Sequence, residues 1–223
     1  MVRQPVPRLL GRLCFYACGL VILCIGIILS TKASLGVAPV NSLPYLSSEI
    51  SPLTLGQSTT VLYLICIAAQ CTLKRKLSLP VLLQLPLSYL FGLMVDFFNR
   101  LLDVVQPHSL PASLLWLVVA ISCIALGVVM VVGMDLVPNP PDGMVQTISQ
   151  VSGREFGLVK NIFDLSMVVL SLVGGLLFSH QIIGIGPGTV LSALFVGRLA
   201  ALFRSRLSGW MEFLTASTPP LAK

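Results

Sequence analysis

The sequence is poor in charge. Asp, Glu, Lys and Arg together make up 10% of its 223 residues, whereas hydrophobic residues make up 56%. The mean hydropathy is +0.96. A water-facing exterior needs far more charge than this, so the composition excludes a soluble globular protein and indicates an integral membrane protein.

The sequence also lacks the motifs of common enzymes and metal sites. Its two histidines, His108 and His180, have no nucleophile or metal-binding partner beside them. It contains no Walker motif and no H-E-x-x-H, and its six cysteines form no C-x-x-C pair. We therefore expect no enzymatic activity, no catalytic residues, no bound metal and no cofactor.

Apolar runs account for most of the chain. A helix needs about 20 residues to cross a hydrocarbon core of roughly 30 Å, and six runs are long enough. They lie near residues 13–32, 55–73, 79–99, 113–133, 156–178 and 182–203. We expect the lipid bilayer to surround these six spans.

The basic residues indicate the topology. The net charge is +6, but most of the excess flanks apolar runs, so it does not point to nucleic-acid binding. An N-terminus in the cytoplasm places most basic residues there, namely Arg3, Arg8, Arg12, Lys74, Arg75, Lys76, Arg154, Arg204, Arg206 and Lys223. The outer loops keep only Lys32 and Arg100. This asymmetry predicts a multi-pass membrane protein with both termini cytoplasmic.

The chain also resembles itself at a fixed spacing of 101 residues. The aligned pairs are Gly26 and Gly127, Pro39 and Pro140, Ser48 and Ser149, Ser51 and Ser152, Gly56 and Gly157, and Pro86 and Pro187. Gly and Pro determine where helices start, bend and stop, so their matched order predicts the same elements twice. Because each copy holds three spans, the second copy should be inverted in the membrane. We predict one all-α integral membrane domain built from two inverted three-helix repeats, 1–103 and 104–223.

A shorter segment follows the first span of each copy, at 36–49 and 137–150. Each places Pro and then Asn or Asp ahead of a helical stretch, which predicts a half-helix that is re-entrant or lies at a membrane face. The equivalent residues Asn41 and Asp142 should cap these half-helices. They either act as caps alone, or their helix ends bind an anionic or carboxylate-bearing ligand. The candidate substrate-binding residues in these segments are Asn41, Ser42, Tyr45, Asp142 and Gln146.

Lys160 and Asp164 lie four residues apart in the fifth span, on one helix face. Ionisable residues inside a span are costly and usually face a cavity or a partner, so the pair is a candidate coupling or gating site. The alternatives are a structural ion pair, or a Lys160 side chain that extends to the membrane surface. Their counterparts in the first copy, Thr59 and Tyr63, are uncharged, so the two copies differ here.

Helix breakers occur at matched places in the third and sixth spans, around Pro86 and Pro187. Two interpretations are open. Backbone carbonyls that lose their helical hydrogen bonds at these breaks contact a ligand, together with the adjacent side chains of Gln84 and Thr189. Alternatively, the breaks are kinks that let the helices pack closely. Gln57 belongs to a polar stripe with Thr60 and Tyr63 that is a further candidate cavity lining.

Asp96 lies at the end of the third span, beside Asn99 and Arg100. A carboxylate near the outer face can remain in contact with water. We therefore expect Asp96 to be solvated rather than to be part of a site.

Several stretches resemble the YczE/YitT-like bacterial integral membrane proteins. They include Ala33–Gly56, the run Leu83–Pro86 with Asp96 after it, and Phe156, Gly157, Lys160 and Asp164 in the pattern Phe-Gly-x-x-Lys-x-x-x-Asp. The likeness covers nearly the whole chain. It implies a multi-pass protein of the bacterial inner membrane and draws attention to Lys160 and Asp164 without assigning them a role.

These features favour a small secondary transporter or permease for a polar or zwitterionic small molecule. The alternative is a non-transporting membrane subunit that regulates another complex or captures its substrate. Under either interpretation, the candidate partners besides a small-molecule solute are a second copy of the chain, in a homodimer, and another membrane protein. A passive channel needs more polar positions per span than the sequence offers.

Overall fold

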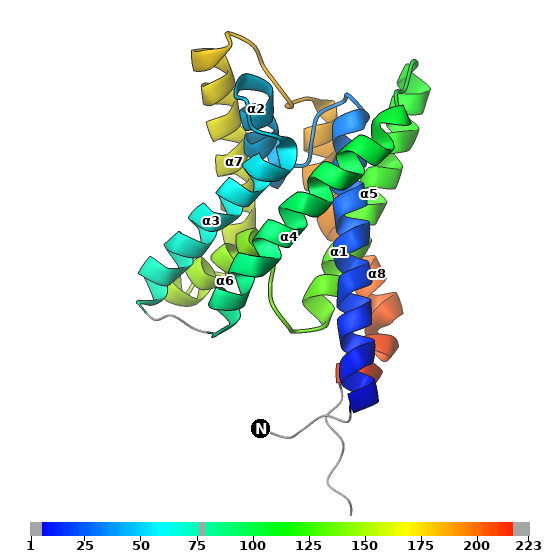
Figure 1. The fold of residues 1–223 in the computed structure, drawn as a ribbon, viewed down its shortest axis with the longest axis vertical. Helices are drawn as coiled ribbons and strands as arrows, with labels where there is room; N and C mark the ends of the chain where they lie inside the picture. Colours follow the sequence, from blue (N-terminus) through cyan, green and yellow to red (C-terminus); the bar gives the residue numbers. More distant parts are fainter. Residues whose placement is uncertain (1–5, 76–78, 216–223) are drawn as a thin grey trace, which may run out of the picture.

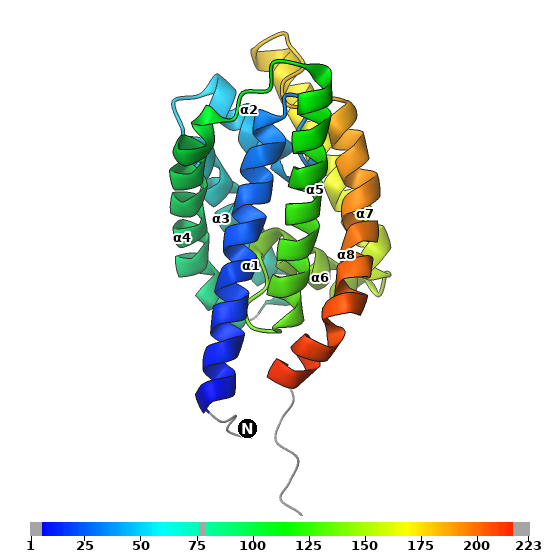
Figure 2. The ribbon, with the colours of Figure 1, turned by 90° about the vertical axis from the view of Figure 1, so that its right-hand side faces the viewer.

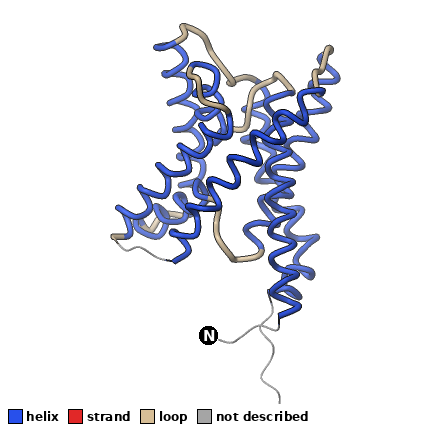
Figure 3. The backbone as a smooth tube through the Cα atoms, viewed as in Figure 1, coloured by secondary structure: helices blue, strands red, loops and turns tan. Residues whose placement is uncertain are grey.

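The computed structural model describes residues 6–75 and 79–215, which are helical apart from short connections (Figure 3). The elements are α1 (Val6–Lys32), η1 (Pro39–Asn41), α2 (Ser42–Ile50), α3 (Leu55–Lys74), α4 (Leu79–Leu101), η2 (Leu102–Val104), α5 (Leu110–Gly133), α6 (Pro140–Ser152), α7 (Phe156–Phe178) and α8 (Pro187–Thr215). No strand occurs in these two ranges, as predicted. Arg3, Lys76 and Lys223, on which the predicted topology partly rests, lie outside the described residues.

Five of the described helices are long and apolar enough to cross a membrane. They are Leu9–Lys32, Leu55–Lys74, Leu79–Val104, Leu110–Gly133 and Phe156–Phe178, and they contain the first five predicted spans. The sixth predicted span, 182–203, is not among the five. The helix in this region is α8, which carries Arg198, Arg204 and Arg206.

The short helices lie where the sequence predicts them, between the first and second long helices of each half. η1 begins at Pro39 and α6 at Pro140, and α3 begins at Leu55 and α7 at Phe156. Both pairs of starts are 101 residues apart. The local signals differ, however, because a capping box of Thr54 and Gln57 begins α3, whereas α7 has no side-chain cap.

The breaks predicted at Pro86 and Pro187 are not equivalent. Pro86 lies inside α4, whereas Pro187 is the first residue of α8. Gly184 and Gly186 precede Pro187 and have low helix propensity, so the chain there is irregular and the helix begins only at the proline. The predicted breaks therefore differ in form: Pro86 lies within a continuous helix, whereas non-helical chain precedes α8.

α1 and α5 form the central helix pair and run side by side in opposite directions (Figures 1 and 2). Gly26 and Gly127 permit their close approach. A Cβ atom on Gly26 would lie 2.7 Å from the backbone nitrogen of Ile124, and one on Gly127 would lie 2.6 Å from that of Leu23. The absence of side chains at these two positions brings the backbones together.

The helices form two packed groups, one of which consists of α1, α5 and α8. α8 packs mainly on α5, while α7 packs against α2, α6 and η1, and α3 packs against α2 and α6. α4 crosses between the groups and packs on both α3 and α1 (Figure 1). α7 and α8, although consecutive in sequence, therefore belong to different groups.

Candidate functional site

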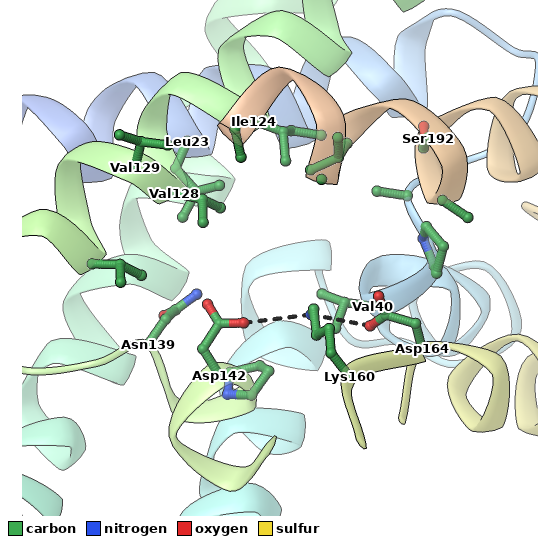
Figure 4. Close-up of a pocket in the computed structure, with 18 of the residues that line it drawn as sticks. Leu23, Val40, Ile124, Val128, Val129, Asn139, Asp142, Lys160, Asp164 and Ser192 are labelled. Atoms are coloured by element: carbon green, nitrogen blue, oxygen red, sulfur yellow. Dashed lines mark ion pairs between the residues drawn. The ribbon is translucent and has the colours of Figure 1, made fainter. Parts of the chain in front are cut away.

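A cavity of about 480 Å³ lies between the two groups of helices (Figure 4). α1, α5 and α8 line one side, and η1, α3, α6 and α7 contribute to the other. Ligand pockets in proteins typically occupy roughly 300–1,000 Å³. The cavity is therefore large enough for a small organic molecule.

Three charged side chains form an ion-pair cluster in this cavity. The ammonium Nζ of Lys160 lies 3.0 Å from Oδ1 of Asp164 and 3.4 Å from Oδ1 of Asp142. The side chains of Lys160, Asp142 and Asp164 are 29%, 20% and 24% exposed, respectively. Because all three residues line the cavity, a ligand in it can reach the cluster. We call these three residues the charged triad.

The start of α6 brings Asp142 to the cavity. Pro140 and Pro141 occupy the first positions of the helix and are buried, and Asp142 follows in the first turn. Proline suits these positions because the first N–H groups of a helix have no partner within the helix. The positive end of the helix dipole also favours a carboxylate there.

Of the two residues predicted to cap the short helices, Asn41 occupies the N-cap position of α2, whereas the prediction is wrong for Asp142. Asp142 lies in the first turn of α6, and the residue at the N-cap position is Asn139. Asn41 does precede α2, but its side chain makes no capping hydrogen bond. Asn139 donates from Nδ2 to the hydroxyl oxygen of Tyr63 at 3.0 Å, which ties the start of α6 to α3.

The opposite wall of the cavity is mainly aliphatic. Leu23 of α1 and Ile124, Val128 and Val129 of α5 face the triad across the cavity (Figure 4). One face of α8 continues this wall with mainly small residues, namely Ser192, Ala193, Val196, Gly197, Ala200, Ala201 and Arg204. The cavity therefore has the charged triad on one side and, on the other, a mainly apolar wall that also contains Arg204.

Four of the ten predicted substrate-binding residues line this cavity: Asn41, Asp142, Lys160 and Asp164. A fifth, Tyr45, lines a second pocket of about 330 Å³ between α2, α3 and α4. This second pocket is also lined by Lys32, Glu49, Asp96 and Arg100.

The other five predicted site residues have different surroundings. Ser42 is buried and donates to the carbonyl of Pro39, and Gln57 belongs to the capping box of α3. Gln84 is buried and donates to Oε1 of Gln70, while Gln70 donates to Oε1 of Gln84. Thr189 is buried and bonds to the backbone of Gly184 and Gly186, and Gln146 is exposed.

Asp96 is more than a solvated carboxylate. Its Oδ2 accepts a hydrogen bond of 2.6 Å from the hydroxyl of Thr54, and its Oδ1 accepts one of 2.8 Å from the backbone N–H of Gly56. These bonds join α4 to the start of α3. The expectation that Asp96 is only solvated is therefore incomplete, because sequence spacing does not reveal a contact between separate helices.

Several cavity residues were not singled out as site residues from sequence. They are Asn139, Asn161, Ser192 and Arg204. Asn139 had a local signal, since it stands between Pro138 and Pro140 just before the short helix. Ser192 had none, because a serine in an apolar helix usually bonds to its own backbone.

Two curated relatives from Bacillus subtilis (strain 168) are similar to this chain along most of their length. The uncharacterized membrane protein YczE is 27% identical over 192 residues, which cover 85% of this chain and 84% of the relative. The uncharacterized protein YyaS is 26% identical over 191 residues, which cover 85% of this chain and 90% of the relative. No solved structure matches the chain significantly.

The similarity to YczE confirms the resemblance seen in the sequence motifs. Together with the apolar helices it identifies a membrane protein. The model of a family of unknown function, DUF6198, matches residues 10–205, which is most of the chain. The chain belongs to the DUF6198 family of membrane proteins.

Proposed function

We propose that the protein is a small secondary transporter or permease for a small polar molecule. The observation that carries this proposal is the cavity with its charged triad, because ionisable groups inside a membrane bundle are costly and mark substrate or ion pathways. Residues from both halves of the chain line this cavity. Substrate sites at the interface of two repeats are typical of secondary transporters.

The order and direction of the helices support two inverted repeats of three spans each. A long helix, a short helix and two further long helices occur twice along the chain. α1, α3 and α4 run opposite to α5, α7 and α8, respectively, and α2 and α6 lie at opposite ends of the bundle (Figures 1 and 2). In this proposal α8 is the sixth span.

The charge distribution supports cytoplasmic termini in a bacterial inner membrane. α1 begins and α8 ends at the same end of the bundle (Figure 1). Arg154, Arg204 and Arg206 lie towards this end, whereas Lys32 and Arg100 lie at the opposite one. The positive-inside rule then assigns the end with the helix termini to the cytoplasm.

The helix pairs α3–α4 and α7–α8, which are equivalent in the two repeats, differ in how closely they pack. This difference suggests how the cavity opens to one side of the membrane and then to the other. α3 and α4 are in close contact, since a Cβ atom on Gly56 would lie 2.0 Å from the carbonyl oxygen of Gly92. Asp96 adds two hydrogen bonds across this crossing. In the proposed cycle this contact closes the outer side.

The equivalent pair, α7 and α8, is separated by the cavity. The positions equivalent to Gly56, Gly92 and Asp96 are Gly157, Ala193 and Gly197, which are all small. A Cβ atom on Gly157 would have only Glu155 Oε1 at 4.0 Å, and one on Gly197 would have no atom within 4 Å. In the proposed cycle α7 and α8 close over these small residues when α3 and α4 separate, which opens the cavity to the other side.

Transport by the purified protein in liposomes tests this function. Uptake of a solute by the protein alone supports a transporter, whereas strict dependence on a co-purifying protein would favour the alternative of a regulatory or substrate-capturing subunit. The solutes to assay first are those that raise the melting temperature of the protein, because a ligand of the folded state stabilises it by mass action.

Disulfide cross-linking tests the proposed closure. Gly157→Cys with Ala193→Cys, in a background without the six native cysteines, should cross-link in a substrate-dependent manner. Leu165→Cys with Leu202→Cys is the matched control, because both leucines are exposed on the outer surfaces of the same helices. Equal cross-linking of the two pairs, or none at Gly157 and Ala193 under any condition, would contradict the closure.

A further inference from the structure

We propose that the cavity binds an organic monocation, in which an ammonium group contacts the charged triad and a short apolar body lies against the aliphatic wall. The transport of this ligand rests on the proposed function. Its binding rests only on the cavity and on the residues that line it.

The charge of the triad favours a cation. Asp142 and Asp164 contribute two negative charges and Lys160 one positive charge, so the triad carries a net charge of −1. Lys160 contacts only Oδ1 of each carboxylate. Each carboxylate has two oxygens and about four acceptor positions, so both retain capacity for another donor.

The surroundings strengthen this preference. Among the residues that the structure describes, Lys160 is the ion-pair partner of both carboxylates, and hydrocarbon side chains of α1 and α5 face them across the cavity (Figure 4). Arg204 of α8 also lines the cavity, but within the described part of the chain it forms no ion pair with either carboxylate. Excess negative charge beside an apolar wall is poorly solvated, and its attraction for a cation is stronger there than in water. An anionic group placed at the triad would face this excess charge and be repelled.

The composition of the site favours an organic cation over a metal ion. In residues 6–75 and 79–215 no group of three or more His, Cys, Asp or Glu side chains is placed to hold a metal ion. Hard metal ions usually take six or more oxygen ligands, whereas an ammonium group needs only a few acceptors. Leu23, Ile124 and Val128 provide hydrocarbon contact for the rest of such a molecule.

The hydroxyl of Ser192 is a further polar group at this cavity. Ser192 lines the cavity, is fully buried and has no hydrogen-bond partner among the described residues. It lies on α8, away from the triad (Figure 4). A buried hydroxyl without a partner costs free energy, so a polar substituent on the ligand body is compatible with this wall.

Calorimetric titration with molecules that share one carbon chain tests the ligand class. The full-length protein in nanodiscs is titrated with hexylammonium, hexanoate, 1-hexanol and 6-aminohexanoate, and heats from empty nanodiscs are subtracted. Hexylammonium should bind at least about tenfold more tightly than the other three, as expected for a charge-assisted contact. Tighter binding of hexanoate or 6-aminohexanoate, or no binding of any of the four, would overturn the proposal.

Neutralising one carboxylate tests the role of the triad. Asp164→Asn removes the excess negative charge and should weaken hexylammonium binding about tenfold or more. Asp142→Asn, on the other helix, should have the same effect and provides the test if Asp164→Asn does not fold. Asp135→Asn is the matched control, because Asp135 is exposed and does not line the cavity. Equal affinities of the cavity variants and the control would refute the assignment.

Transport and ligand class can fail separately. If hexylammonium binds through the triad but liposomes containing the protein do not accumulate it, the transport proposal fails and the ligand class stands. If the protein accumulates hexanoate and does not bind hexylammonium, transport stands and the ligand class is wrong.

Discussion

The ammonium of Lys160 lies 3.4 Å from the carboxylate of Asp142 and so connects α7 to the first turn of α6. The pair joins a long apolar helix to a short helix that starts among buried residues. Asp142 is thereby held by Lys160 and by the positive end of its own helix. This contact, together with Asp164, places three charges in a cavity between the helices.

Replacing Lys160 with methionine tests whether the triad stabilises the fold. Lys160→Met leaves two carboxylates without their shared cation. The free energy of unfolding should fall by about 1–3 kcal/mol, which lies between the typical losses for breaking an exposed ion pair and a buried one. Thermal unfolding in detergent measures this loss. Arg154→Met, at an exposed position, should change stability by no more than about 0.5 kcal/mol. A similar result for both variants would show that the triad has no structural role.

Alanine at the equivalent glycines 56 and 157 tests the difference between the two helix pairs. Gly56→Ala would place Cβ 2.0 Å from the carbonyl oxygen of Gly92, so we expect a loss of about 1–3 kcal/mol or more from overpacking. Gly157→Ala meets no atom closer than 4.0 Å and should be neutral, or stabilising by up to about 1 kcal/mol, because alanine favours the helix. Equal destabilisation of the two variants, measured by thermal unfolding, would contradict the open arrangement of α7 and α8.

A bulky residue at Gly157 tests the proposed closure. Gly157→Leu should leave the free energy of unfolding and hexylammonium affinity nearly unchanged but lower uptake into liposomes at least about tenfold, because the side chain would prevent α7 from closing on α8. Gly209→Leu is the control, since its Cβ atom also has no neighbour within 4 Å and Gly209 does not line the cavity. Undiminished uptake by Gly157→Leu would argue against closure at this position.

Replacing Gln84 with leucine tests whether this residue serves packing or ligand binding. Gln84→Leu removes both hydrogen bonds between the side chains of Gln84 and Gln70. Nε2 of Gln70 keeps its hydrogen bond to the carbonyl of Pro140, but the buried Oε1 loses its donor, which should cost about 1–3 kcal/mol. Hexylammonium affinity should not change, because Gln84 does not line the cavity. Gln146→Leu, at an exposed position, should change neither quantity. Weaker ligand binding by Gln84→Leu with unchanged stability would restore Gln84 as a site residue.

The helical elements could largely be predicted from the sequence. The first five spans needed only the length and hydropathy of apolar runs, and the short helices followed from Pro39 and Pro140. The start of α8 at Pro187 could not be predicted in this way. The same residue type bends a helix or begins one according to its neighbours, and here the preceding glycines prevent a helical turn.

The candidate site was only partly predictable. Lys160 and Asp164 were recognisable because two charges one turn apart are rare within a span. Their association with Asp142 was not, since it depends on where the start of α6 lies relative to α7. Gln84 and Thr189 have the polar character of site residues, but their hydrogen bonds to Gln70 and to the backbone of Gly184 engage them in packing.

The sequence by itself determined that this protein lies in a membrane and which segments form its helices, because hydropathy and helix-breaking residues act over short distances along the chain. Only the tertiary structure decided which polar residues meet. The charged triad, the aliphatic wall and the separation of α7 from α8 arise from contacts between segments distant in sequence, and these depend on the packing of whole helices, which no local pattern encodes.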